Sequence, residues 1–542
     1  MVVDDARTTV RANPEPLISR VPYLPGLDAM RALAVVAVML YHANSDWMPG
    51  GYLGVEMFFV ISGYLITLLV IAERERTYRV SLRDFWIRRA RRLLPALAVL
   101  LVGVTIWTVL FERDAVGQLR GDVIAGVFYG SNWYQLWVGL GYTADGDFAP
   151  LRHLWSLAVE EQFYLVWPLV MVLLLRKHGS RRIALTSRWL VGVALGLTAL
   201  TALAYHPGVI GEPSQTPDAY WSVFGQPISK LDFAYIGSFS RASGILLGAA
   251  LAMVWRPYAL RRSTVGTAHR GIDLIAALAL IGFGWMTFNV PLVTDAGAAN
   301  GTLFRGGMLA ASLLTLVVIA AVAHPTARMN VILDRNLLRW IGTRSYGLYL
   351  YHWPVYQAIR GIAGNKLTFG QFAFAMVVTV VLAEASYRLV ETPVRERRFV
   401  ATWRGYIGRS HRARRGALAG GAVLAATSLF AGATLATADV QVNEIEQSFQ
   451  AADDDVVDLT ALAEGDGDGA TIDRSDLVVP DGDSRSVERS ATTPAAPTTA
   501  APTTVAPTTS PGSSVPAATS ADAGTSTETD ESGAAPSTTL AS

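Results

Sequence analysis

The chain has 542 residues, of which 51% are hydrophobic and 16% are charged, and it contains no cysteine. A soluble globular domain carries roughly 25% charged residues, so this composition argues against a soluble protein and favours a membrane protein. The lack of cysteine excludes disulfides, thiolate metal sites and a cysteine nucleophile, and we expect neither a metal nor a nucleic acid as a partner.

Eleven apolar runs approach the length of about 20 residues that a membrane span requires. They lie at 27–47, 52–72, 93–111, 153–175, 189–206, 238–255, 271–288, 303–324, 345–363, 370–390 and 416–438. The segment before Leu27 has no apolar run of its own, so we expect no signal peptide and take 27–47 as the first span. A twelfth run, 121–141, is long enough but carries Asn132, Gln135 and several glycines.

The distribution of basic residues decides how the chain is oriented in the membrane and whether the run 121–141 spans it. If residues 1–23 are cytoplasmic and 121–141 does not span, the cytoplasmic segments hold 32 Lys and Arg and the outer segments hold 8. A spanning 121–141 would reverse every later loop and violate the positive-inside rule. The sequence therefore predicts an all-α polytopic fold with eleven spans, in which 121–141 is an outer, re-entrant or interfacial segment. We expect a multi-pass plasma-membrane protein, with the lipid bilayer as a partner.

The C-terminal part of the chain differs in composition from the rest. Residues 396–415 form a basic cytoplasmic linker, 416–438 an additional span, and 439–542 an acidic and then Ser/Thr/Pro/Ala-rich segment. Such a segment buries too little apolar surface to fold, so we expect a disordered extracytoplasmic tail. The tripeptide Gly482-Asp483-Ser484 is not interpreted as a serine esterase site, because no histidine follows His411 to act as its base.

Ionisable groups within spans are expensive and suggest functional sites. Arg31 and His42 are 11 residues apart on the first span, so on a helix they share a face about 16 Å apart along the axis. This spacing suits a long anionic ligand such as an acyl-coenzyme A, with Arg31 near a phosphate and His42 near the acyl group. His42 is the candidate base, and Glu56, at a similar depth on the second span, is a candidate to orient it, with a structural ion pair as the alternative.

Two further stretches supply candidate residues. The stretch FWIRRARRLLPAL (85–97) places Arg88, Arg89, Arg91 and Arg92 at the cytoplasmic surface, where they could bind phosphates or serve positive-inside topology. The stretch HLWSLAVEEQFYLVWPL (153–169) carries Glu160 and Glu161 as candidate acids or acceptor-binding groups; these neighbours do not share a helix face, so we expect different partners. The remaining candidate substrate-binding residues are His153, Trp155, Ser156, Arg241 and His352.

Together these stretches resemble the integral-membrane acyltransferase-3 family, over roughly residues 24–395. The resemblance rests on the Arg31-x10-His42 pattern, GYLGVEMFFVISGYLI (51–66), the two stretches above, IGTRSYGLYLYHWPV (341–355) and Glu391-Thr-Pro. It implies ten family spans, an acyl-CoA donor and O-acylation of bacterial surface polysaccharides (lipopolysaccharide included), peptidoglycan or glycolipids. It also implies functional importance for Arg31, His42 and the arginine stretch. The chain has the eleventh span of members with a fused esterase-like domain, but not that domain.

We therefore expect a membrane O-acyltransferase that takes an acyl group, with acetyl the expected one, from cytoplasmic acyl-CoA to a hydroxyl of an envelope glycan, glycolipid or peptidoglycan. The acyl-CoA is a substrate, and no permanently bound cofactor is expected. In this scheme the acceptor arrives between spans one, two and four. Direct transfer and transfer through an acylated protein residue both remain open, as do relay to a separate extracytoplasmic transferase and a different function, that of a flippase for a lipid-linked sugar.

Overall fold

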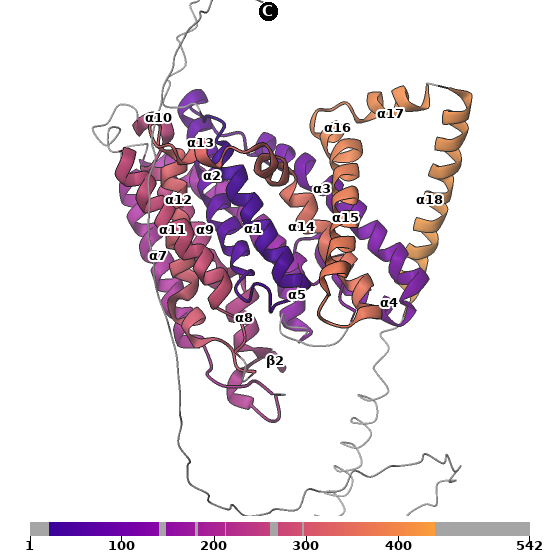
Figure 1. Ribbon diagram of the computed structural model, residues 1–542, viewed down its shortest axis with the longest axis horizontal. Coiled ribbons are helices and arrows are strands. Elements are labelled where there is room, and N and C mark those ends of the chain that lie inside the picture. The colour runs from indigo at the N-terminus through magenta and orange to yellow at the C-terminus, as the bar shows by residue number, and fades with distance from the viewer. Residues whose placement is uncertain are drawn as a thin grey trace, which may run out of the picture. The chain divides into compact units, whose positions relative to one another are not determined.

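A computed structural model describes residues 21–139, 148–178, 183–211, 213–260, 269–294, 297–408 and 410–438. Within these ranges the chain is almost entirely helical (Figure 1), and the two named strands, β1 (Tyr220–Val223) and β2 (Gln226–Ser229), form one antiparallel hairpin. The predicted all-α membrane fold is confirmed. The predicted disordered tail, 439–542, lies outside the described residues and stays a prediction.

Ten helices of the described residues are long and apolar enough to cross a membrane. They are α1 (Pro25–Ala43), α2 (Leu53–Thr77), α3 (Leu82–Phe111), α6 (Leu154–His178), α7 (Ile183–Ala204), α8 (Lys230–Ile236) running into α9 (Ser238–Val254), α11 (His269–Asn289), η6 (Leu303–Gly307) with α12 (Met308–Ala323), α15 (Phe369–Ser386) with η7 (Tyr387–Glu391) and α16 (Thr392–Arg395), and α18 (His411–Thr437). Each coincides with a predicted run.

The remaining predicted span, 345–363, belongs to α14 (Asn336–Ala363). This helix has 28 residues, so it is long enough to span, but it is less apolar than the other ten. Its polar and aromatic side chains, among them His352 and Arg360, lower its hydropathy. The shorter elements are η2 (Arg113–Ala115), η4 (Pro217–Ala219), α10 (Pro257–Leu260), α13 (Met329–Leu333) and α17 (Phe399–Ile407).

The doubtful run 121–141 does not form one spanning helix. It is divided between α4 (Val116–Val127) and α5 (Ser131–Trp137), and Tyr129 between them has a positive φ of 52°. At 1.5 Å per residue even α4 is about 18 Å long, which is too short to cross the bilayer. The segment is non-spanning, as the basic residues predict.

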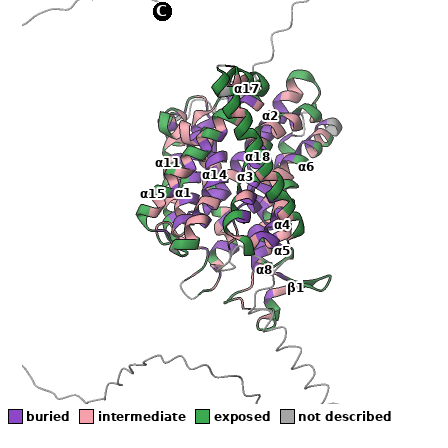
Figure 2. Cartoon of the chain, turned by 90° about the vertical axis from the view of Figure 1, so that its right-hand side faces the viewer, coloured by how far each residue is buried: buried purple, intermediate pink, exposed green. Residues whose placement is uncertain are grey.

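The most buried helices form the centre of the bundle. The spanning windows of α1 and α2 are 72% and 78% buried inside the protein, whereas that of α18 is 6% buried, as the contrast in Figure 2 illustrates. Glycines allow the central helices to approach closely: a Cβ at Gly248 of α9 would lie 2.1 Å from the Val60 carbonyl oxygen of α2, and one at Gly342 of α14 would lie 1.9 Å from the Asp28 carbonyl of α1. Small residues serve this purpose in membrane helix packing.

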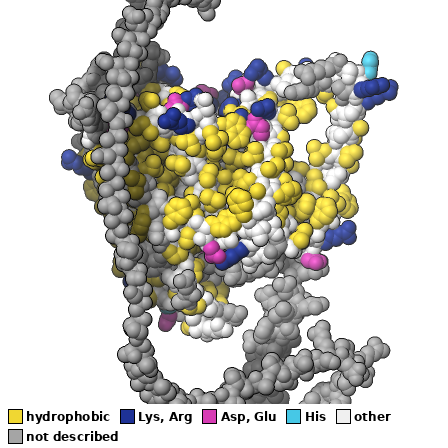
Figure 3. All heavy atoms as spheres, in the orientation of Figure 1, with side chains coloured by type: hydrophobic (Ala, Val, Ile, Leu, Met, Phe, Trp, Pro, Cys, Tyr) yellow, Lys and Arg dark blue, Asp and Glu magenta, His cyan; other side chains and the backbone are white. Residues whose placement is uncertain are grey.

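Polar and apolar side chains separate along the bundle. In the view of Figure 3, hydrophobic side chains cover a broad band, and Lys and Arg gather mainly along the upper edge. The same edge carries α10, α13 and α17 in Figure 1. The start of α1 lies at this end, because the Gly26 N–H donates to the Asn330 side chain of α13.

Candidate active site

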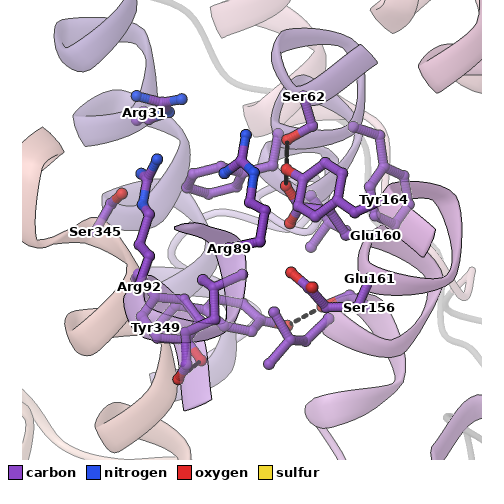
Figure 4. Close-up of a pocket in the computed structure, with 16 residues that line it drawn as sticks. Arg31, Ser62, Arg89, Arg92, Ser156, Glu160, Glu161, Tyr164, Ser345 and Tyr349 are labelled. Carbon is purple, nitrogen blue, oxygen red and sulfur yellow. Dashed lines mark hydrogen bonds between the residues drawn. The ribbon is translucent and has the colours of Figure 1, made fainter. Parts of the chain in front are cut away.

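A cavity that is open to its surroundings lies between α1, α2, α3, α6 and α14. Its polar lining, shown in Figure 4, includes Arg31, Ser62, Arg89, Arg92, Ser156, Glu160, Glu161, Tyr164, Ser345 and Tyr349. Its apolar lining includes Val55, Phe58, Leu93 and Leu157. Three guanidinium groups beside an apolar wall could hold a ligand with anionic phosphates and a neutral arm.

Three of the five predicted phosphate-binding arginines meet at this cavity. Arg31 donates to Asp28 (2.9 Å), and the Arg89 guanidinium lies 4.6 Å from the centre of the Tyr164 ring. Arg89 and Arg92 share a face of α3 because they are three residues apart.

The other two arginines of the stretch do not line the cavity. Arg88 pairs with Glu73 at 3.1 Å and its side chain is 59% exposed, and Arg91 is not among the lining residues. Of the four arginines of the stretch, Arg89 and Arg92 line the cavity, and phosphate binding by any of them stays a prediction.

The two adjacent glutamates of α6 border the same cavity with different surroundings. The Glu160 carboxylate accepts hydrogen bonds from Ser62 and Tyr164. The buried Oε1 of Glu161 has no hydrogen-bond partner among the described residues. Glu160 is thus held by its own helix and α2, whereas Glu161 keeps an accepting atom beside the cavity.

Three buried histidines cluster where α1, α6 and α14 meet. His42 Nδ1 lies 2.9 Å from His352 Nε2, and the two rings are nearly parallel, with an interplanar angle of 5°. His352 Nδ1 lies 2.6 Å from the Tyr349 carbonyl oxygen. His153 Nε2 lies 3.1 Å from the Leu350 carbonyl oxygen, and its ring packs edge-on against that of His352.

Tyr349 connects the histidine cluster to the cavity. Its hydroxyl is hydrogen-bonded to Ser156 (2.6 Å) and donates to the His153 carbonyl (3.0 Å), and both Tyr349 and Ser156 line the cavity. The backbone carbonyl of the same tyrosine contacts His352. The arginine-lined space and the His42–His352 pair are therefore separated by one layer of side chains.

The predicted role of Glu56 at His42 is not what the structure shows. The Glu56 carboxylate accepts from Ser312 (2.6 Å) and pairs with Arg241 (3.2 Å), and the side chains of Glu56 and Arg241 are 2% and 1% exposed. This is the structural ion pair that the sequence left as the alternative. The residue that contacts the His42 ring is His352 of α14, so the meeting point involves the first, fourth and ninth predicted spans rather than the first, second and fourth.

Two candidate substrate-binding residues belong to the surroundings of this ion pair instead. The Arg241 guanidinium lies 5.4 Å from the Phe59 ring, 5.7 Å from the Trp155 ring and 5.3 Å from the Tyr235 ring. Trp155 is 1% exposed and does not line the cavity. Both residues pack the bundle between α2, α6 and α9.

Sequence reasoning missed several polar residues of the site. Ser62, Tyr164 and Tyr349 line the cavity, and Arg360 donates to the His42 carbonyl oxygen at 2.5 Å. Tyr349 could have been found, since it is three residues before His352 on the same helix face. Ser62 and Tyr164 could not, because they are ordinary residues whose role comes from facing Glu160. No group of three or more His, Asp or Glu suited to a metal ion occurs in the part of the chain that the structure describes.

Comparison with known proteins identifies the family. A family model described as an acyltransferase domain, acyltransferase 3, matches residues 24–388. The chain belongs to the acyltransferase-3 family.

Curated relatives share this region. The chain is 35% identical over 380 residues to the O-acetyltransferase OatA of Staphylococcus aureus, which covers 70% of the chain and 58% of the relative. It is 36% identical to the putative peptidoglycan O-acetyltransferase YrhL of Bacillus subtilis (382 residues, 70% and 56%). It is 34% identical to the peptidoglycan O-acetyltransferase OatA of Listeria monocytogenes (386 residues, 71% and 58%). The match thus spans less than two thirds of each relative, and no solved structure matches the chain.

Proposed function

We propose that this acyltransferase-3 protein is an O-acetyltransferase that transfers the acetyl group of cytoplasmic acetyl-CoA to a hydroxyl of peptidoglycan on the outer side of the membrane. The observation that carries the proposal is the cavity with Arg31, Arg89 and Arg92, which one layer of side chains, Tyr349 among them, separates from the His42–His352 pair. The names of the relatives support acetyl as the group and peptidoglycan as the acceptor. The gathering of Lys and Arg at the end where α1 begins supports a cytoplasmic N-terminus.

The residues of the cavity suit the parts of the donor. Guanidinium groups bind phosphate oxygens through paired N–H donors, so Arg31, Arg89 and Arg92 would hold the phosphates of coenzyme A. The apolar wall formed by Val55 and Leu157 would take the uncharged pantetheine arm. The thioester would then lie toward Tyr349 and the histidines.

In the proposed reaction, the acceptor hydroxyl oxygen attacks the thioester carbonyl carbon. A new C–O bond forms, the C–S bond breaks, and the hydroxyl proton passes to His42 and then to the leaving thiolate. The products are an O-acetyl ester and free coenzyme A. If the acetyl group instead passes to a separate extracytoplasmic transferase, the same donor site and the same base serve the first transfer.

The proposal is tested with the full chain in lipid vesicles, acetyl-CoA labelled on the acetyl group and soluble peptidoglycan fragments as the acceptor. We expect label in the glycan fraction with the wild-type protein and none with His42→Ala. Label on an added second protein instead of the glycan would support the relay. Wild-type protein that transfers no acetyl group to either would overturn the proposal.

A further inference from the structure

His352 makes two hydrogen bonds with its two ring nitrogens, and one of its partners has a fixed role. The Tyr349 carbonyl oxygen can only accept, so His352 Nδ1, at 2.6 Å, must carry a proton. An uncharged imidazole has a single N–H, and His352 is fully buried among other side chains. Its Nε2 therefore presents a lone pair and can only accept.

The same logic extends to His42. Its Nδ1 lies 2.9 Å from His352 Nε2, so the hydrogen bond between the rings requires the proton to be on His42 Nδ1. The ring planes differ by 5° and the ring centres are 5.2 Å apart, which is close to the 2.9 Å between the nitrogens plus the distance of each nitrogen from its ring centre. The N–H of His42 and the lone pair of His352 therefore point along one line in one plane, which favours this bond. In the uncharged His42 ring the lone pair is then on Nε2.

We infer that His352 is the positioning residue that holds His42 in the Nδ1–H tautomer, with Nε2 as the base that takes the acceptor proton. This inference rests on the proposed function. It gives His352 of α14 the role of orienting the His42 ring, for which the sequence had suggested Glu56. When His42 takes up the proton, its Nδ1–H still donates to His352, which stabilises the imidazolium as a carboxylate does in a catalytic triad. The proton returns from Nε2 to the leaving thiolate.

The surroundings hold His352 in this position. The bond to Tyr349 comes from the preceding turn of the same helix, so α14 itself sets the ring orientation. The His153 ring packs edge-on against His352 with ring centres 5.8 Å apart, and Trp353 packs against His42 at 4.8 Å. Arg360 fixes the end of α1 through the His42 carbonyl. Neither ring needs to move for the proton to be taken up.

Two amide substitutions separate the role in positioning from a role in packing. The amide of His352→Asn reaches the place of Nδ1, so it keeps the bond to Tyr349 and loses the one to His42. The longer His352→Gln brings its amide oxygen to the place of Nε2, where it can accept from His42. His352→Leu removes both bonds, and His324→Asn, a buried histidine at the end of α12, is the matched control.

Acetyl transfer is measured with the full chain in vesicles, using labelled acetyl-CoA and soluble peptidoglycan fragments. We expect kcat to fall about 10²- to 10⁴-fold in His352→Asn and His352→Leu, the range for a misplaced or wrong-tautomer base, with KM for acetyl-CoA little changed. We expect His352→Gln to stay within about tenfold of wild type, as its acceptor is retained. Asn and Gln variants with equal kcat, when both still bind acetyl-CoA, would overturn the inference.

A second measurement reads the tautomer without any activity. Solid-state NMR of the chain in lipid, labelled with ¹⁵N-histidine, distinguishes protonated from unprotonated ring nitrogens. We expect His42 with its proton on Nδ1 in wild type and a mixture in His352→Leu. A proton on Nε2 of wild-type His42 would overturn the inference, whether or not the protein transfers acetyl groups. Inactive wild-type protein with the expected tautomer would contradict the proposed function alone.

Discussion

Two groups of polar residues lie within the membrane bundle, and they differ in whether they are enclosed by the protein or border a cavity. Between α2, α9 and α12, Glu56 is bonded to Ser312 and paired with Arg241, and the guanidinium is enclosed by aromatic rings. Between α1, α3, α6 and α14, arginines and glutamates face an open cavity, and the Oε1 atom of Glu161 has no partner among the described residues. The first group is closed and the second is open to a ligand.

This difference shows that an intramembrane charge does not by itself identify an active site. In a buried ion pair the attraction between the two charges offsets part of their desolvation cost, so both charges are already engaged within the protein and are not available to bind a substrate. Charges that border a cavity can instead exchange water or lipid headgroups for substrate groups. The comparison predicts that changes in the two groups affect different measurements, namely stability for the first and acetyl transfer for the second.

The largest effect is expected for His42→Ala. Loss of the base should lower acetyl transfer by about 10²- to 10⁴-fold, because positioned proton transfer contributes a factor of this size. His42→Ala also leaves His352 Nε2 without its partner, which costs about 1–3 kcal/mol, so transfer is compared per folded molecule. Transfer at the wild-type rate would remove His42 from the mechanism.

Arg241→Met should act on stability. It leaves Glu56 buried without its partner, which typically costs about 3–5 kcal/mol. We expect a lower unfolding midpoint and a lower yield of folded protein, with much of the loss recovered by Glu56→Gln on the same background. The acetyl transfer per folded molecule should stay near wild type. An Arg241→Met protein that folds normally but transfers no acetyl group would show that Arg241 takes part in the reaction, and would contradict the distinction between the two groups.

Arg89→Gln and Arg92→Gln should each weaken the donor site. A charge-assisted hydrogen bond contributes about 1.5–3 kcal/mol, so the KM for acetyl-CoA should rise roughly 10- to 100-fold with a smaller effect on kcat. Arg88→Gln is the matched control on the same helix, since Arg88 faces Glu73 and not the cavity. Equal effects at Arg88 and Arg89 would indicate a general surface attraction rather than a site.

The smallest effect concerns a carboxyl outside the spans. Burial raises the pKa of Asp122 in α4 from 3.8 to about 7, against the opposing influence of Arg152. A folded pKa above the unfolded value means that the folded protein binds the proton more tightly, so stability should fall as the pH rises from about 4 to 7. Unfolding midpoints between pH 5 and 8 should show a weaker dependence in Asp122→Asn. Identical slopes would contradict this account.

The fold was largely predictable from the sequence because each helix that crosses a bilayer needs a run of about 20 mostly apolar residues. Each predicted run coincides with a helix, and the distribution of Arg and Lys correctly rejected 121–141 as a span. Helix periodicity also predicted that Arg31 and His42 share a face of α1, and in the structure this face is turned toward α14, since Arg31 shares the cavity with Tyr349 and His42 contacts His352.

The partners of individual side chains were less predictable. Glu56 and His42 lie on consecutive helices, but depth alone does not give the rotation of a helix, and α2 turns Glu56 toward Arg241 of α9. The contact between His42 and His352 joins residues 310 positions apart, and no local pattern carries that information. For the same reason Trp155 and Arg241 looked like site residues, although both pack the core.

In the mechanism we propose, the donor cavity and the histidine cluster form one path between the two sides of the membrane. It is tested most directly with vesicles that contain the full chain, acetyl-CoA labelled on the acetyl group on the side of the α1 start, and peptidoglycan fragments on the other side. We predict label in the glycan with wild-type protein, and none with His42→Ala or when both the donor and the acceptor are on the outer side. Label that appears only when the donor and the acceptor share a side would contradict the claim.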